Sequence, residues 1–201
     1  MPDKTALTGH PVHALIASRW SPYAFADEPV SKQDLAALFE AARWAPSSYN
    51  EQPWRWIAAR REDEAAFARL LSTLVETNRA WARHAPVLAV GLTSLRFARN
   101  DKPNKAAHHD LGLAAAQLTF EASARGLVVH QMIGIEPERV RELYAVPEDV
   151  EPLTALAIGA AGDPASLPEK LRERELAPRT RKPLSELVFG ARYGRESTLF
   201  D

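Results

Sequence analysis

The feature that most constrains this chain is a predicted helix over residues 109–125 that is apolar nearly all round. Leucine, alanine and phenylalanine cover more than one of its faces, at positions 111, 113–116, 118, 120 and 122. A helix with apolar residues on most faces is buried, either in a core or in a subunit interface. Gly126 ends this helix, and the apolar run over 127–132 predicts a strand directly after it.

Shorter elements are predicted on both sides of this helix. Apolar periodicity and end signals predict helices over 12–18, from Ser31, over 67–83 and from Glu136, and apolar runs predict strands over 54–59, 86–92 and 153–158. Residues 96–105 are polar and indicate a surface loop. Taken alone, the alternation of helices and strands suggests a parallel α/β sheet.

The chain is long enough for one sizeable domain, and its last part differs in composition from the rest. From Asp163 onward it is charged, carries four prolines and has little that could form a core by itself. We therefore predict a single domain with a core over about 12–162 and an arm over about 163–201, which lies on another surface such as that of a partner subunit.

Composition excludes several classes of function. The formal net charge is −1, so no bulk attraction to nucleic acid or to an anionic membrane is expected. The absence of cysteine rules out disulfides, iron–sulfur clusters and a cysteine nucleophile. Residues 1–10 are polar, without the apolar stretch of a secretory signal, and no apolar run is long enough to span a bilayer. We expect a cytoplasmic protein.

The first candidate site is Arg19-Trp20-Ser21, directly after a predicted helix. An arginine offers a fork of N–H donors that matches a phosphate, and a serine adds a rotatable hydroxyl. By itself the pair also fits an ordinary surface role, because such spacings occur by chance in most proteins.

The second candidate is the loop over 46–54, which leads into a strand. Asn50 and Gln52 each carry an amide that both donates and accepts hydrogen bonds. Such groups suit the edge of a flavin ring or its ribityl hydroxyls, but they also suit a hydrogen-bonded turn.

The third candidate is the end of the strand over 127–132, at Ile133 and Gly134. Glycine there allows a flat ligand to approach the backbone and leaves an N–H to point at it. A simple strand-to-helix turn explains the same residues equally well.

The fourth candidate is the basic run that contains Arg179, Arg181 and Lys182. Three cations within four residues could complete a phosphate site, although such runs are more often solvated tails. None of the four clusters decides the function by itself.

The order and spacing of these clusters resemble those of the FMN-dependent nitroreductase family, over residues from about 13 to 188. The shared pattern begins with Arg-x-Ser-x-x-x-Phe at 19–25 and Pro-Ser-Ser-x-Asn-x-Gln-Pro-Trp at 46–54. It continues with Asp-x-Gly at 110–112, Gly-Leu at 126–127 and Arg-Lys-Pro-Leu at 181–184. The segment over 46–54 is the most specific of these motifs.

The resemblance implies an α+β fold, with a mostly antiparallel central sheet surrounded by helices, in an intertwined homodimer. It replaces the parallel sheet suggested by alternation. The helix over 109–125 is similar to the family's central interface helix, and the proline-rich arm is similar to the segment that extends over the partner. Both FMN sites then lie at the subunit interface.

The resemblance also implies roles for individual residues. Arg19 and Ser21 would contact the FMN phosphate or ribityl chain, Trp20 would contribute backbone contacts, and Arg179 or Arg181 would close the phosphate site. Asn50 and Gln52 would face the ring or ribityl groups in the site shared with the other subunit. Ile133 and Gly134 would lie under the reactive edge of the ring, with the Gly134 N–H near flavin N5.

One residue departs from the family pattern. Many relatives carry Arg or Lys two positions after the serine, where this chain has Tyr23. A cation near the pyrimidine end of the ring stabilises the charge of reduced flavin. As a cofactor-binding residue Tyr23 could form a hydrogen bond, but it supplies no charge at neutral pH. Lys102 and Lys105 are candidates for a replacement cation because their loop could reach the site.

The function implied by the resemblance is transfer of electrons from NADPH or NADH, through FMN, to a small electron-poor acceptor such as a nitroaromatic, quinone or activated alkene. No protein side chain need be catalytic, because the flavin carries the chemistry. The alternatives are a specialised relative, namely a flavin-dependent dehydrogenase or dehalogenase, and a non-enzymatic FMN-binding protein. A metal-dependent hydrolase built on His108, His109 and Asp110 is disfavoured, because adjacent histidines on a helix point in different directions.

Overall fold

The computed structural model describes residues 3–200, and the sheet at its centre is antiparallel throughout. Four strands pair in the order β1-β2-β4-β3. Their bounds are β1 Trp54–Arg60, β2 Val87–Ser94, β3 Val128–Met132 and β4 Val150–Gly159. The antiparallel sheet expected from the family resemblance is confirmed, and the parallel sheet suggested by alternation alone is wrong.

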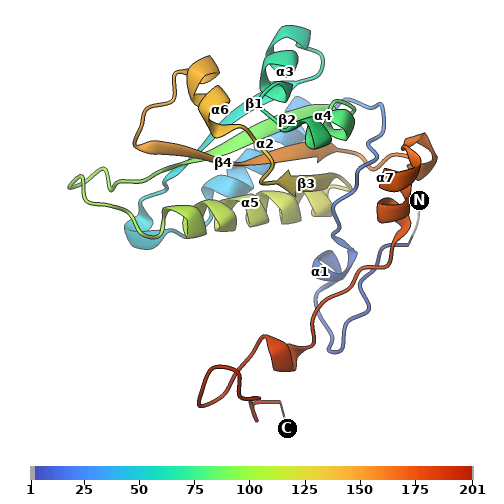
Figure 1. Cartoon of the computed structure of the whole chain (residues 1–201), viewed down its shortest axis with the longest axis vertical. Helices are drawn as coiled ribbons and strands as arrows, with labels where there is room; N and C mark the ends of the chain where they lie inside the picture. The colour runs from blue at the N-terminus through green and yellow to red at the C-terminus, as the bar shows by residue number, and fades with distance from the viewer. Residues whose placement is uncertain (1–2, 201) are drawn as a thin grey trace.

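Seven α-helices and three short 3₁₀ turns surround the sheet within the described residues (Figure 1). The helices are α1 Ala14–Ser18, α2 Lys32–Arg43, α3 Glu64–Leu71, α4 Glu76–Ala82, α5 Ala107–Ala124, α6 Pro137–Tyr144 and α7 Glu169–Leu176. The 3₁₀ turns are η1 Ser48–Asn50, η2 Pro164–Ser166 and η3 Leu184–Glu186. None of the helices over residues 3–200 is long and apolar enough to cross a membrane.

The sheet separates two apolar layers. One face packs on α2 and α5 through a cluster that includes Leu38, Leu111 and Leu118, all at most 1 % exposed. The other face packs on α3, α4 and α6 through residues such as Leu70, Trp81 and Val140. Successive side chains of a strand point to opposite faces. In β2, Val87 and Ala89 therefore belong to the first layer, and Leu88 and Val90 to the second.

The helix predicted over 67–83 is in fact two helices. α3 ends at Leu71 and α4 begins at Glu76. Between them the backbone turns away to bond the chain after β3: the Glu136 N–H donates to Thr73 O at 2.7 Å, and the Val75 N–H donates to Gly134 O at 3.1 Å. These long-range hydrogen bonds break a helix that apolar periodicity alone would continue.

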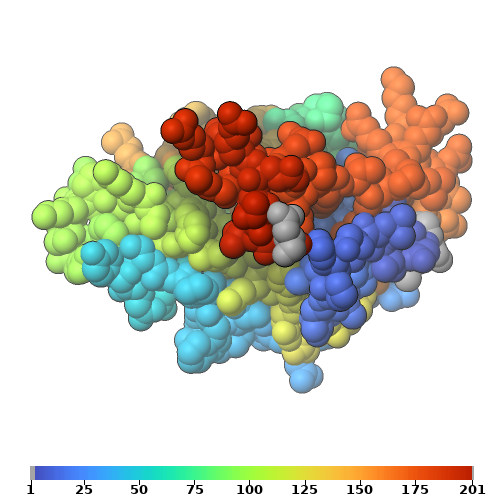
Figure 2. Space-filling view, turned by 90° about the horizontal axis from the view of Figure 1, so that it is seen from below, coloured from blue at the N-terminus to red at the C-terminus, as the bar shows by residue number. Residues whose placement is uncertain are grey.

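The last forty residues contain an element that was not predicted. α7 lies within the predicted arm, and beyond it the chain runs away from the sheet beside the N-terminal residues (Figure 1). Figure 2 shows the two ends of the chain against one another on one face. Lys4 accounts for part of this contact, because its Nζ donates to Glu175 O at 2.7 Å. The extension of these residues over a partner subunit stays a prediction.

α5 keeps an apolar strip that the chain itself does not cover completely. Its inner face is buried, whereas Leu113, Ala116 and Phe120 are only partly buried and share one side of the helix. This strip is where the expected homodimer would pack.

We predict that Phe120→Glu leaves the chain folded but separates the dimer into monomers, because it places a charge in the centre of the apolar strip. Phe120→Leu, which keeps the site apolar, should remain dimeric. Light scattering after size-exclusion chromatography measures the mass of each. A wild-type chain that elutes as a monomer contradicts the expectation at once.

Candidate functional site

A pocket of about 210 Å³ gathers positive charge from three distant parts of the chain. Its lining includes Trp20, the carboxylate of Glu175 and six other polar side chains: Lys4, Arg19, Ser21, Arg174, Arg179 and Arg181. We call it the arginine pocket. The two clusters singled out at Arg19–Ser21 and at Arg179–Arg181 therefore meet in space, as an oxyanion site would require.

The end of α1 positions the first of these residues. Arg19 follows the helix with extended backbone angles, and its Nη1 donates to Ser21 Oγ at 3.2 Å. Pro22 is buried behind it, and its carbonyl accepts a hydrogen bond from His130 Nδ1 at 2.8 Å. Since a carbonyl only accepts, the proton of the His130 ring lies on Nδ1. β3, which carries His130, thus holds the segment that presents Arg19 and Ser21.

Arg179 closes the pocket by satisfying backbone groups. Its Nη1 donates to Ala17 O at 2.6 Å and to Lys4 O at 2.7 Å. Ala17 belongs to the last turn of α1, where carbonyls have no partner inside the helix. Arg181 Nη1 instead donates to the neighbouring Thr180 O at 2.7 Å. Arg179 is therefore anchored on two other segments, whereas Arg181 is anchored only on its own.

The electrostatics of the pocket favour an anion. Burial lowers the pKa of Arg19, and the charges of Arg179 and Arg181 lower it further. Burial and the charge of Arg181 also lower the pKa of Arg179. None of the ion pairs found among residues 3–200 includes these arginines. The lining holds only one carboxylate, that of Glu175, so the pocket keeps an excess of positive charge that an oxyanion would stabilise.

Tyr23 does not line the arginine pocket. Its ring packs edge-on against the buried Trp81, 5.2 Å between centroids, and lies 4.8 Å from the His130 ring. It also borders a separate pocket of about 500 Å³ with Trp81 and Arg61. The side chain at this departure from the family pattern is therefore half-buried among aromatic groups.

Ile133 and Gly134 follow the end of β3. Ile133 is 71 % exposed, and the Gly134 N–H donates no hydrogen bond within the described part of the chain. A Cβ at position 134 would lie 2.5 Å from Asn78 Nδ2 and 2.9 Å from Val75 Cγ2. Glycine is thus required here by the close packing of α4. The sequence-based explanation, close approach of a ligand, is not needed to account for it.

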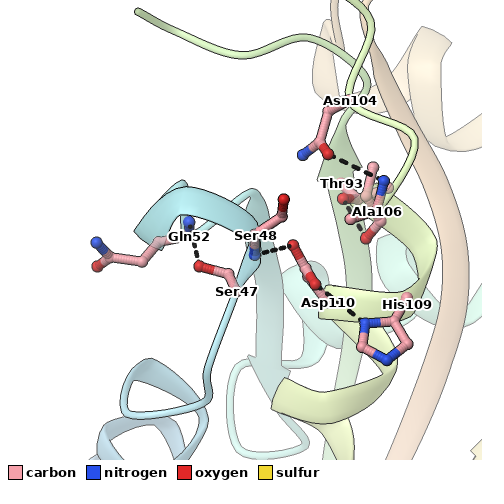
Figure 3. A network of polar contacts seen from close by, with 9 residues as sticks. Ser47, Ser48, Gln52, Thr93, Asn104, Ala106, His109 and Asp110 are labelled. Atoms are coloured by element: carbon pink, nitrogen blue, oxygen red, sulfur yellow. Dashed lines mark hydrogen bonds and ion pairs between the residues drawn. The ribbon is translucent and has the colours of Figure 1, made fainter.

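The segment that carries Asn50 and Gln52 has a strained backbone. Tyr49, Asn50 and Gln52 have φ values of 55°, 56° and 52°. These values lie in the left-handed region, which residues other than glycine seldom adopt. Two hydrogen bonds hold this shape (Figure 3): Ser48 N–H donates to Asp110 Oδ2, and Gln52 N–H donates to Ser47 Oγ, both at 3.0 Å. Strain held in this way is typical of functional loops.

A single chain does not bring all the predicted residues together. The segment at Ser48–Asn50 lies at the N-terminal end of α5, whereas α1 and α7 lie well away from that end (Figure 1). The residues that line the arginine pocket belong to those two helices or stand next to them in the sequence, apart from Lys4. Arg19, Trp20, Ser21, Arg179 and Arg181 therefore form one group. Asn50 and Gln52 form another at a separate location.

Sequence reasoning missed four residues of these two groups. Lys4, Arg174 and Glu175 border the arginine pocket, and the buried Asp110 holds the loop at Ser48. Asp110 could have been found, because it belongs to the Asp-x-Gly motif. No local pattern marks Lys4, which reaches the pocket only through the fold.

The two histidines that suggested a metal site each contact a different carboxylate. His108 Nε2 lies 2.9 Å from Glu151 Oε2, and His109 Nδ1 lies 3.1 Å from Asp110 Oδ1. Over residues 3–200, no three histidine, aspartate or glutamate side chains gather as metal ligands would.

Comparison with known proteins identifies the family. The model of the nitroreductase family matches residues 16–160. The chain belongs to the nitroreductase family. A solved structure described as an oxidoreductase containing FMN superposes with a TM-score of 0.90 at 32 % identity, covering 98 % of this chain and 100 % of the other. NfrA2 of B. megaterium superposes with a TM-score of 0.69 at 25 % identity, covering 89 % of this chain and 73 % of the other.

Curated sequences agree with this assignment. A Streptomyces coelicolor protein with the provisional name NADH dehydrogenase/NAD(P)H nitroreductase is 29 % identical over 172 residues, which is 76 % of this chain and 84 % of that protein. The predicted family and the nitroreductase-like α+β fold are confirmed, and the chain is an oxidoreductase of this family.

The environment of His130 predicts that the stability of the fold depends on pH. Burial lowers the pKa of His130, only partly offset by the hydrogen bond to Pro22, and the charge of Arg19 lowers it further. Its native pKa is below the unfolded value of about 6.5, so the unfolded chain binds more protons in that interval. The stability from neutral His130 is complete above about pH 6.5 and is lost as pH falls through that value towards the native pKa.

The melting temperature should therefore rise as the pH is raised from about 5 to about 6.5, and His130→Phe should flatten part of that rise. Phenylalanine keeps the packing against Tyr23 and Trp81 without a titrating group. A smaller slope should remain in the variant, because burial also lowers the pKa of His84. Identical slopes in the two proteins would contradict the assignment to His130.

Proposed function

We propose that the chain is an FMN-dependent oxidoreductase that passes electrons from NADPH or NADH to a small electron-poor acceptor, such as a nitroaromatic, a quinone or an activated alkene. The observation that carries the proposal is the arginine pocket, where four guanidiniums and a lysine outnumber the one carboxylate of the lining, that of Glu175. A phosphate monoester carries the charge and the oxygen acceptors that such a pocket needs. A structural relative at 32 % identity contains FMN, which has that group.

The donor set fits FMN residue by residue. Arg19, Ser21 and the backbone at Trp20 would hold the phosphate and ribityl chain, and Arg181 would complete the phosphate site. Arg179, which already donates to two carbonyls, would act more as an anchor with fewer donors left. Ile133 and Gly134 would lie against the ring, with the unused Gly134 N–H as a donor to it.

When bound, FMN supplies the hydride chemistry, and the protein supplies position and field. The arginines would neutralise its phosphate. The exposed Ile133 offers an apolar surface for the ring. Tyr23 brings no charge, and the cations that border the same pocket of about 500 Å³ are Arg61 and Arg83. No protein general base is required, because water or the flavin can supply the proton.

We also propose that two chains build each site. In a two-fold dimer the same surface of both chains meets. Packing the Leu113–Phe120 strip of α5 against its copy, with the helices antiparallel, brings the N-terminal end of one α5 near the other chain's C-terminal half. α1 packs on α5 within each chain. Asn50 and Gln52 of one subunit would thus approach the arginine pocket of the other.

The decisive experiment is the visible absorption spectrum of the purified protein, before and after NADPH or NADH is added without oxygen. We expect a flavin spectrum that bleaches with at least one of the two donors. Bound flavin that fails to bleach would favour a specialised dehydrogenase or dehalogenase, or a non-enzymatic FMN-binding protein, with Tyr23 as the first residue to replace by Arg. A colourless protein that takes up no FMN contradicts the proposal.

We predict that Arg19→Ala weakens FMN binding by about ten- to hundredfold, since a hydrogen bond to a charged group contributes about 1.5–3 kcal/mol. Riboflavin, which lacks the phosphate, should bind wild type and variant with similar affinity. Arg172→Ala, on the exposed side of α7, removes the same charge outside the pocket and serves as the matched control. Quenching of flavin fluorescence measures all six affinities, and equal losses for both flavins would contradict the phosphate role of Arg19.

A further inference from the structure

A carboxylate in the lining of the arginine pocket is buried without an ionic partner. Glu175, the next-to-last residue of α7, is only 2 % exposed. Glutamates are almost never buried so completely unless they are paired, yet none of the ion pairs over residues 3–200 includes Glu175. Burial raises the pKa of this carboxyl. Hydrogen bonds from backbone N–H groups lower it, and so does the nearby charge of Lys4, but together they offset the rise only in part. Burying such a carboxylate costs free energy, which indicates that it has a structural or functional role.

The contacts of Glu175 join three segments of the chain. Its Oε2 accepts a hydrogen bond from the Tyr23 N–H at 2.7 Å. Its backbone carbonyl accepts one from Lys4 Nζ at 2.7 Å, and the same Nζ donates to Ala177 O at 2.5 Å. The other carboxylate oxygen, Oε1, is buried and has no hydrogen-bond partner.

These three segments carry the cations of the pocket. Tyr23 lies two residues after Ser21 and four after Arg19, and the chain that follows Ala177 carries Arg179 and Arg181. Arg179 then donates back to Lys4 O and to Ala17 O. Glu175 thus stands at the junction where the relative positions of all these groups are set. The Pro22 carbonyl is held from the opposite side by His130.

We propose that Glu175 is a positioning residue of the arginine pocket, whose carboxylate oxygen fixes the backbone at Tyr23 and thereby sets the affinity for the phosphate of a flavin. The inference rests on the proposed function for the nature of the ligand. Glu175 touches no ligand in this account. It acts through the Tyr23 N–H, which would be left without an acceptor if the carboxylate were removed, and the segment from Arg19 to Tyr23 would shift relative to Arg179.

The test compares the affinities for FMN and riboflavin, which differ only in the phosphate, by quenching of flavin fluorescence in the full-length protein. Glu175→Ala should weaken FMN binding by about tenfold, as loss of a hydrogen bond to a charged group would. The same variant should change the affinity for riboflavin by no more than about twofold, because riboflavin lacks the phosphate that the pocket holds. Glu175→Gln keeps an oxygen that can accept the Tyr23 N–H, so it should restore the selectivity for FMN.

Glu173→Ala is the matched control. Glu173 is exposed on the same helix, so its replacement removes one negative charge without touching Tyr23. If this control changed the ratio of FMN to riboflavin affinity as much as Glu175→Ala does, the effect would be one of net charge, and the positioning role would be overturned.

Other outcomes separate positioning from general stability. Equal weakening of both flavins by Glu175→Ala, or no change in either, overturns the inference. Should Glu175→Ala fail to fold, Glu175→Asp takes its place, because the shorter side chain withdraws the oxygen from Tyr23, and the same selective loss is expected. A folded Glu175→Gln that loses FMN selectivity also overturns the role of the acceptor oxygen. A wild-type chain that binds no FMN contradicts the proposed function itself, a result distinct from all of these.

Discussion

The burial of α5 against the sheet is the contact on which the rest of the structure depends. Leu111, Ala114, Leu118 and Ala122 are at most 1 % exposed, and they pack on a sheet whose β2 is buried on both faces. At about 25 cal/mol per Å² of apolar surface removed from water, a fully buried leucine contributes roughly 1.5–3 kcal/mol. This helix therefore fixes the sheet, and it also fixes the loop at its start through Asp110.

Asp110 shows how the core helix controls a distant segment. It lies in the first turn of α5, where a carboxylate also interacts favourably with the helix dipole. Its Oδ2 accepts the Ser48 N–H. Since the residues that follow Ser48 are held in the left-handed region, the loop keeps its shape only while its anchor is rigid. Burial of Asp110 in the core supplies that rigidity.

Local sequence patterns predicted most of the secondary structure. They failed where long-range hydrogen bonds determine where a helix ends. Ser31 begins α2 as expected, and its Oγ accepts the Asp34 N–H at 2.9 Å. The break between α3 and α4 could not be predicted, because it depends on Thr73 and Val75 bonding the chain after β3. α7 was missed because its exposed side is almost wholly charged, so apolar periodicity has nothing to mark except the few residues that face inward.

The residues of the candidate site also divide into those that a local motif marks and those that only the fold brings there. Arg19, Ser21, Arg179 and Arg181 were found because each belongs to a motif, and the fold then places them in one pocket. Lys4 and Glu175 belong to no motif. Their part in the pocket comes from Lys4 Nζ bonding the carbonyls of Glu175 and Ala177, a contact between residues near opposite ends of the chain. Sequence alone holds no signal for such a contact.

The distribution of charge in the proposed site has a consequence for how it would hold a flavin. Tyr23, Trp81 and His130 form an aromatic group, and His130 is neutral at neutral pH because burial lowers its pKa. The positive charge lies instead in the arginine pocket. A pocket of this kind binds the cofactor mainly through its phosphate, since a desolvated guanidinium interacts strongly with an oxyanion and weakly with a neutral ring. Affinity should therefore depend on the phosphate end, and the ease of reduction on what stands near Tyr23.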